Sequence, residues 1–436
     1  MKPLTVNRCL LILVVVLFLS PLSSKAYSVL THEAVVDAGW QKYIRPLLKK
    51  KYPAATDSEL HVAHSYAYGG CMIADMGYFP FGSKYFTNLA HYVRTGDFVM
   101  ALLSESQNLN EYAFSIGALS HYMADKYGHS LGTNYAVPIM YNKVGKKYGK
   151  VATYEDNRVD HSRVEISFDV LQIARGNYPT QAYHDFIGFN VAKPVLERAF
   201  LKTYGQDINV VFGDLDLAIS TFRWAVRSLL PTLTRSAWVM KKNDIKKLNP
   251  SATSKSFHYK MKKKDYRLEF GKTTQKATFE DDVIALFIEI LPKVGPLRVL
   301  RIKEPDSTSE KLFIASFDTV SMHYAHAVVE LQYENIKLAN IDFDTGKPIK
   351  YGEYNLTDKT YDEMVDKLKD NKFENLTQSL KTDIIGFYNS ADTSQSAKAN
   401  PAEWKKTYLA LQGIKQATPV KIDSLKTAKG LSYKTQ

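Results

Sequence analysis

The feature that most constrains this chain is a set of metal-ligand side chains at helical spacing. His121, Asp125 and His129 are four residues apart, and His161 and Glu165 repeat the interval downstream. Residues four apart lie on one face of a helix. Imidazole and carboxylate groups are ligands that zinc accepts, and helical metal sites are built with this spacing. One such pair is common by chance, but two pairs with a third histidine in register predict a metal centre carried by helices.

The first 26 residues have the pattern of a secretory signal peptide. Basic Lys2 and Arg8 precede an apolar run over residues 10–19, and small residues lead to Ala26. Cleavage there would leave Tyr27 as the mature N-terminus, so we expect a secreted or periplasmic protein. The apolar run is too short for a comfortable membrane span. No other run reaches that length, and we expect no transmembrane segment in the mature chain.

Charge and cysteine content narrow the possible partners. The formal net charge of +12 falls to +9 once Lys2, Arg8 and Lys25 leave with the signal. A basic exported protein suits an anionic partner, so peripheral contact with phospholipid membranes and binding of nucleic acid both stay open. Cys9 also leaves with the signal, and Cys71 alone cannot form an internal disulfide.

Apolar residues recur at intervals of three and four along most of the chain, which predicts an all-α fold. We expect a helical domain over residues 27–235, with the metal centre in it. Lysine-rich residues 236–275 are predicted to be a basic linker or exposed loop. Residues 276–436 are predicted to form a helical extension that packs on the first domain or follows the loop.

Six short stretches contain most of the ligand-type residues in one order along the chain. They read A-Y-S-V-L-T-H-E at the start, D-M-G-Y-F-P-F-G at Asp75, F-T-N-L-A-H-Y-V at His91, G-A-L-S-H-Y-M-A-D at His121, G-H-S at His129 and D-H-S-R-V-E at His161. This order resembles the zinc-dependent phospholipase C family, whose fold and metal centre are shared with fungal single-strand nucleases. A later D-F-D-T-G-K-P at Asp342 is similar to a segment of longer bacterial members, which indicates that the second half belongs to the same unit.

The resemblance implies a mainly helical fold with three zinc ions. Its ligand sets, carried over to this chain, place Asp75, His91, His121 and Asp125 on one ion and His129, His161 and Glu165 on a second. The third ion would take the free amine and carbonyl of Tyr27 together with His32, and Asp125 would be shared between sites. Ligation by an amine requires removal of the signal peptide.

The implied activity is metal-assisted hydrolysis of a phosphodiester, with Asp75 orienting or deprotonating the attacking water. The leading hypothesis is an exported phospholipase C that cuts the glycerol–phosphate bond. Aromatic residues near Asp75 could hold a choline headgroup by cation–π contact, although packing is the commoner role: Tyr78, Phe79, Phe81 and Phe86.

Two alternatives stay open. The step of five residues from Tyr27 to His32 is similar to that of the fungal nucleases, and with the basic charge it favours a phosphodiesterase or nuclease of the same fold. The single mature cysteine and the long second half argue against that reading. The other alternative is a zinc-binding envelope protein without catalysis, because a site can bind metal without turnover.

Overall fold

We analysed a computed structural model, which describes residues 28–178, 190–257, 302–391 and 400–427. The described residues form helices joined by turns and loops, with two isolated β-bridges and no strand among them, so the predicted all-α fold is confirmed. No helix within those ranges is long and apolar enough to cross a membrane. The predicted signal peptide and Tyr27 lie outside the described residues.

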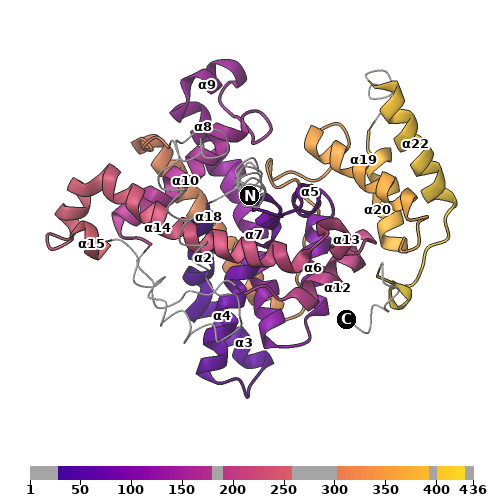
Figure 1. Ribbon diagram of the computed structural model, residues 1–436, viewed down its shortest axis with the longest axis horizontal. Coiled ribbons are helices and arrows are strands. Elements are labelled where there is room, and N and C mark those ends of the chain that lie inside the picture. Colours follow the sequence, from indigo (N-terminus) through magenta and orange to yellow (C-terminus); the bar gives the residue numbers. More distant parts are fainter. Residues whose placement is uncertain (1–27, 179–189, 258–301, 392–399, 428–436) are drawn as a thin grey trace, which may run out of the picture.

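The molecule is built around helix α7 (Leu109–Gly128), which lies at the centre of Figure 1. It begins at Asn108, whose side chain accepts a hydrogen bond from the backbone N–H of Glu111 and so satisfies a free donor of the first turn. Nearly every side chain from Tyr112 to Asp125 is buried. A helix buried on all sides needs neighbours all round. These are α4 (Asp57–Cys71), α6 (Thr95–Glu105) and α18 (Ser307–Leu331).

The contact between α4 and α7 depends on glycine. A Cβ atom placed on Gly117 would lie 2.0 Å from the carbonyl oxygen of Ala67, and one on Gly70 would lie 1.9 Å from that of Phe114. Only a residue without a side chain lets the two backbones come this close. The close approach brings the C-terminal end of α4 against the middle of α7.

Besides α14, the described part of residues 28–257 contains further helices that pack on this pair or on one another. They are α2 (Val29–Gly39), η1 (Trp40–Ile44), α3 (Arg45–Lys51), η2 (Ile73–Tyr78), α5 (Lys84–Tyr92), η3 (His129–Thr133), α8 (Asn134–Met140), α9 (Asn142–Tyr148), α10 (Arg158–Arg175), α12 (Lys193–Tyr204), α13 (Ile208–Phe212) and α15 (Ser254–Phe257). The turn η3 continues α7 with the wider π-helical hydrogen-bond pattern, which is common at functional sites.

The predicted domain boundary at residue 235 falls inside a helix. Helix α14 (Leu215–Leu248) continues through it, with a change of direction at Lys241, and packs along α10. Residues 258–275 of the predicted linker lie outside the described residues.

The described part of the second half of the chain contributes one helix to the bundle around α7 and several helices to a separate group. Helix α18 packs on α7, α2, α8 and η3, so it belongs to the central bundle. The remaining helices gather at the right of Figure 1: α19 (Asn355–Asp370), α20 (Gln378–Asn389), α22 (Pro401–Gln416) and the short η5 (Ile422–Ser424). Between α18 and α19, the chain returns to the centre as a loop over residues 340–348, closed by a bridge between Ile341 and Pro348.

Candidate metal centre

Eight of the nine predicted ligands lie within the described residues, and six elements bring them together in the interior. Each is at most 2 % exposed: His32 on α2, Asp75 on η2, His91 on α5, His121 and Asp125 on α7, His129 on η3, and His161 and Glu165 on α10. Their nitrogen and oxygen atoms form three groups close enough to hold a metal ion: His32 with His121 and Asp125; Asp75 with His91 and His121; and His129 with His161 and Glu165. Tyr27, the ninth, lies outside the described residues.

The first two groups share His121, and Asp125 lies beside histidines of both, so we call them together the first cluster. Asp125 Oδ1 lies 3.6 Å from His32 Nε2, and Oδ2 lies 3.2 Å from His121 Nε2 and 3.4 Å from His91 Nε2. His91 Nε2 is also 3.4 Å from Asp75 Oδ1. The two oxygens of Asp125 therefore face different histidines, which is the arrangement of a carboxylate shared between two ions.

The third group is the second cluster, built from η3 and one turn of α10. Glu165 Oε1 lies 3.0 Å from His161 Nε2 and 3.6 Å from His129 Nε2. The first distance follows from the four-residue interval on α10. The second depends on the π-helical turn, which continues α7 and places the ring of His129 against α10.

These distances test whether the residues fit zinc. Zinc binds nitrogen and oxygen at about 2.0–2.2 Å in tetrahedral geometry, so ligand atoms of one ion should lie roughly 3.3–3.6 Å apart. Five of the six distances between ligand atoms are between 3.2 and 3.6 Å. Both oxygens of Asp75 and Nε2 of His91 are buried without a hydrogen-bond partner within the described residues. Because an unsatisfied buried polar atom is costly, a bound cation accounts for these atoms well.

Two histidines of the first cluster are oriented by backbone carbonyl groups. Nδ1 of His91 lies 2.8 Å from the carbonyl oxygen of Thr87, one helical turn back, and Nδ1 of His121 lies 2.8 Å from that of Cys71. A carbonyl oxygen only accepts, so Nδ1 carries the proton in each ring. The lone pair of Nε2 then points toward the cluster, as metal ligation requires. The Cys71 carbonyl is in place because α4 and α7 approach so closely.

Electrostatics in the first cluster follow from burial and charge. Burial lowers the pKa of His121, but the carboxylates of Asp125 and Asp75 outweigh it and raise the pKa to about 9. Burial raises the pKa of Asp125, and the neighbouring His121 outweighs this and lowers it to about 2. The pKa of His32 is well below its usual value, because of burial and the nearby ring of His121. Without a cation, the cluster thus keeps Asp125 ionised, His32 neutral and His121 protonated, so a cation that binds Nε2 of His121 must displace a proton there.

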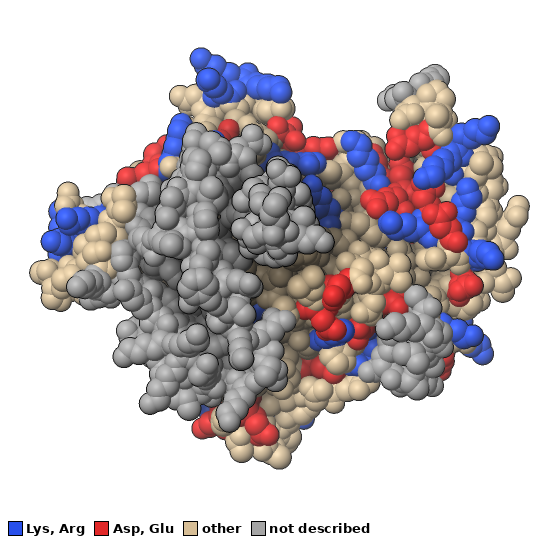
Figure 2. Space-filling view, viewed as in Figure 1, with Lys and Arg blue, Asp and Glu red and all other residues tan. Residues whose placement is uncertain are grey.

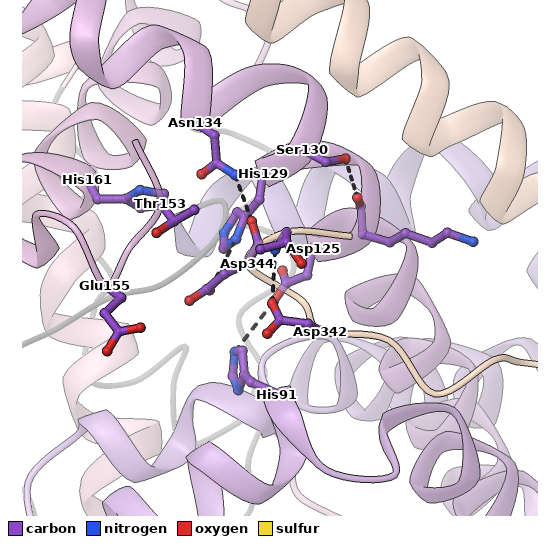
Figure 3. A network of polar contacts seen from close by, with 12 residues as sticks. His91, Asp125, His129, Ser130, Asn134, Thr153, Glu155, His161, Asp342 and Asp344 are labelled. Carbon is purple, nitrogen blue, oxygen red and sulfur yellow. Dashed lines mark hydrogen bonds and ion pairs between the residues drawn. The ribbon is translucent and has the colours of Figure 1, made fainter. Parts of the chain in front are cut away.

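Residues that the sequence analysis did not select also enter the site, from the loop over 340–348. Asp344 Oδ1 lies 3.4 Å from Nδ1 of His129, and the ring of Phe343 lies against those of His91 and His121. Figure 3 shows Asp344 beside the ring of His129, with Asp125 next to them and His91 lower in the view. The signal was the D-F-D-T-G-K-P stretch, which pointed to a shared structural unit but gave no role to its residues.

The aromatic residues near Asp75 have mixed positions. Tyr78 is buried with its ring against that of His91, Phe79 packs on Phe222, and Phe86 lies in the core with Phe98 and Phe200. Phe81 is 45 % exposed. Phe79 and Phe86 are therefore packing residues, and Tyr78 is the aromatic residue of this set closest to the predicted ligands.

Comparison with known proteins gives one finding. Residues 31–213 match a family model described as zinc dependent phospholipase C. No curated protein and no solved structure matches the chain. The matched range contains His32, Asp75, His91, His121, Asp125, His129, His161 and Glu165, and it ends before α14.

Proposed function

Residues 31–213 belong to the zinc-dependent phospholipase C family, and from that premise we propose that this protein is an exported phospholipase C. It would hydrolyse the glycerol–phosphate bond of phospholipids with zinc as cofactor. The observation that carries the proposal is the convergence of eight buried donors into groups with the spacing of zinc ligands. We assign Asp75, His91, His121 and Asp125 to one ion and His129, His161 and Glu165 to a second. A third would be held by His32, Asp125 and the mature N-terminal Tyr27.

The chain's own groups have distinct tasks in this reaction. Bound zinc supplies Lewis acidity that stabilises charge on the phosphoryl oxygens. The carboxylate of Asp75 lies beside His91 with both oxygens buried and without a hydrogen-bond partner among the described residues, and we assign it the proton of the attacking water. The water oxygen bonds to phosphorus, the bond from phosphorus to the glycerol oxygen breaks, and that oxygen leaves with the electron pair and takes a proton. Asp125 and Glu165 hold negative charge that offsets the cations, and burial strengthens each of these interactions.

An exposed apolar stripe on η3 and α8 supports a membrane substrate. Three apolar side chains at intervals of four, Leu131, Tyr135 and Ile139, are 43 %, 40 % and 37 % exposed. They form a stripe along η3 and α8 that other described helices leave open to solvent. A stripe of this kind beside a basic helix is typical of proteins that lie on a lipid surface.

Basic residues continue this surface. Helix α9 and the turn after it expose Lys143, Lys146, Lys147 and Lys150, and the blue side chains at the top of Figure 2 lie where α9 lies in Figure 1. Lysine next to an apolar stripe suits anionic headgroups over an acyl boundary. Two of the three stripe residues, Leu131 and Ile139, are aliphatic and suit acyl chains, whereas bases of single-stranded nucleic acid stack on aromatic rings. We therefore favour phospholipid over nucleic acid and propose peripheral membrane contact through this surface.

The test uses the mature chain that begins at Tyr27, beside a His121→Ala, Asp125→Ala double variant. Elemental analysis gives zinc per chain, and phosphatidylcholine vesicles and single-stranded DNA are offered as substrates. We expect zinc in the mature chain, its partial loss in the variant, and release of phosphocholine only by the unmutated protein. Cleavage of DNA instead of lipid would establish the nuclease alternative. Zinc without turnover of either substrate would leave a zinc-binding envelope protein.

A further inference from the structure

The loop over residues 340–348 reaches the metal centre from the second half of the chain, outside the range that matches the family. Asp342, Phe343 and Asp344 are all at most 3 % exposed, although they lie in a loop. Loops normally run over the surface, because their backbone groups need water. Three consecutive buried residues, two of them acidic, therefore indicate a specific role for this segment.

Asp344 is fixed at both ends of its carboxylate. Oδ1 lies 3.4 Å from Nδ1 of His129, and Oδ2 accepts hydrogen bonds from the hydroxyl groups of Tyr92, at 2.8 Å, and Tyr354. The side chain is fully buried. Two phenol donors on one oxygen leave the other oxygen directed at the imidazole.

The backbone on either side of Asp344 is fixed as well. Its carbonyl oxygen accepts from the side-chain amide of Asn134, at 2.7 Å, and the N–H of Phe343 donates to the carbonyl oxygen of His91, at 3.1 Å. Asp342 Oδ1 accepts from the N–H of Thr345 and closes the turn. The loop is thus bonded to His91 of the first cluster and to Asn134 on α8, the helix that follows η3, and these bonds hold Asp344 beside His129.

The position of His129 between two carboxylates shows what Asp344 does. Its Nε2 faces Glu165 and its Nδ1 faces Asp344, so one nitrogen is directed at the second cluster and the other at a partner outside it. Asp344 is not a member of the ligand groups found among the described residues. A carboxylate on the far nitrogen of a metal-bound imidazole fixes its tautomer and makes it a stronger ligand.

We infer that Asp344 is a positioning residue of the metal centre, which holds His129 in the orientation and tautomer needed to bind zinc with His161 and Glu165. The inference rests on the proposed zinc centre but not on the identity of the substrate. It also means that the second half of the chain completes the second cluster, whose proposed ligands His129, His161 and Glu165 all lie within residues 31–213. Backbone carbonyls serve His91 and His121 in the same way, but at His129 a charged side chain has this task.

The test is zinc affinity of the full mature chain, measured by competition with a coloured chelator, for Asp344→Asn and for Asp342→Asn as the matched control. The control removes the same charge from the same buried loop, but its carboxylate bonds to Thr357 and Thr345. We expect Asp344→Asn to lower the affinity of the chain for one of its zinc ions by about 10–100-fold. Asp342→Asn should keep every zinc within about threefold of the unmutated affinity, and thermal unfolding reports how each change affects the fold.

A second variant covers the case in which Asp344→Asn does not fold. Tyr354→Phe removes one of the two hydroxyl donors to Oδ2 of Asp344 and keeps the charge of the carboxylate. We expect it to lower the affinity for the same zinc ion by a factor of about 3–10, in line with the loss of one hydrogen bond. Unchanged zinc affinity in Asp344→Asn, or in Tyr354→Phe where only that variant folds, would overturn the inference, as would an equal loss in Asp342→Asn. If the unmutated chain binds zinc but cleaves no phospholipid, the proposed function fails and the inference is still decided by the affinities. An unmutated chain that binds no zinc would overturn both.

Discussion

The two clusters of the metal centre are supported in different ways. In the first cluster, His91 and His121 are oriented by carbonyl groups of α5 and α4 that lie within 50 residues in sequence. In the second, His129 faces a carboxylate from a loop more than 200 residues away. A carbonyl partner needs no particular side chain, only two helix backbones in the right place. A carboxylate partner needs one particular residue and a loop that stays buried.

This difference distinguishes the histidines that residues 31–213 orient by themselves from the histidine that also needs the second half of the chain. The carbonyl groups that orient His91 and His121 lie within residues 31–213, although Phe343 of the loop packs against both rings, whereas the partner of His129 Nδ1 is residue 344. Helix α18 packs on α7 and η3 and also on α2, so it lies against elements of both clusters. We therefore expect the first cluster to tolerate changes at Asp344 that disturb the second cluster.

The largest effect is expected from Asp125→Asn, compared with Glu165→Gln. Asp125 faces three histidines of the first cluster, so its loss should remove zinc from that cluster and lower turnover at least about 10³-fold, or about 4 kcal/mol in the activation free energy. Glu165→Gln should remove zinc from the second cluster and leave the first occupied. Zinc per chain and vesicle hydrolysis measure both.

Asp216→Asn is the control for this pair, because that carboxylate is exposed on α14 and pairs only with Lys193 among the described residues. It should retain the unmutated zinc content and activity. If Glu165→Gln emptied both clusters, the division of the centre into separately supported parts would be wrong.

The next effect tests the support of the first cluster through helix packing. In Gly117→Ala the new methyl group would lie 2.0 Å from the Ala67 carbonyl oxygen, so α4 must move away from α7. Overpacking of this kind destabilises by about 3 kcal/mol. It should also displace the Cys71 carbonyl from His121 and weaken zinc binding in the first cluster more than in the second. Urea unfolding and chelator competition measure the two effects.

Gly386→Ala is the matched control, since a Cβ atom there meets nothing within 4 Å and the residue lies inside α20. Alanine is the better helix former, so this variant should be neutral or more stable by about 0.5–1 kcal/mol. Equal destabilisation by both substitutions would show that the close contact of α4 and α7 is not what limits stability.

The sequence predicted which residues the fold gathers at the candidate metal centre better than it predicted the groups that orient them, for a physical reason. Imidazole and carboxylate at intervals of four are visible as letters, and the structure brings eight of the nine selected residues together. The carbonyl groups of Thr87 and Cys71 are backbone atoms that every residue has, so no side-chain pattern marks them. Asp344 is an acidic residue in a loop, and only the fold shows that it is buried against His129.

The all-α class was predictable because the apolar periodicity extends over most of the chain. The boundaries between the predicted domain, linker and extension were not predictable in the same way. The lysines after residue 240 suggested a loop, but Ile245 is buried inside α14 while the lysines around it face solvent, which is the pattern of a helix with one packed side. Which face of α18 would meet α7 also depended on tertiary packing, which periodicity along one segment does not specify.

The smallest expected effect concerns a third kind of support, that of His32. Asp169 on α10 accepts hydrogen bonds from the backbone N–H groups of Leu30 and Thr31 and from the Thr31 hydroxyl, so it caps the start of α2. Burial raises the pKa of Asp169 to about 6, although these hydrogen bonds act in the opposite direction. On α2, Glu33 also has a pKa well above its usual value, because of burial and then the carboxylates of Asp37 and Asp169.

The sign of the pH dependence follows from the raised pKa. Between about pH 4 and pH 6 the folded chain binds more protons at Asp169 than the unfolded chain, whose aspartates have a pKa near 3.9, so the free energy of unfolding falls as pH rises through this window. The contribution is on the order of 1–3 kcal/mol. Asp169→Asn should flatten part of this slope, and the part due to Glu33 should stay.

Urea unfolding of the zinc-free protein at pH 4, 5, 6 and 7 measures the slope, with exposed Asp216→Asn as a control that should keep it. A free energy of unfolding that rises with pH across this range, and is flattened by Asp169→Asn, would mean that the hydrogen bonds to α2 outweigh burial. The start of α2, which carries His32, would then be held by an ionised carboxylate, as His129 is. Histidines supported by carbonyl groups, His91 and His121, would then contrast with histidines supported by carboxylates, His32 and His129. A falling slope that Asp169→Asn reduces would instead keep carboxylate support at His129 as the feature that sets the second cluster apart.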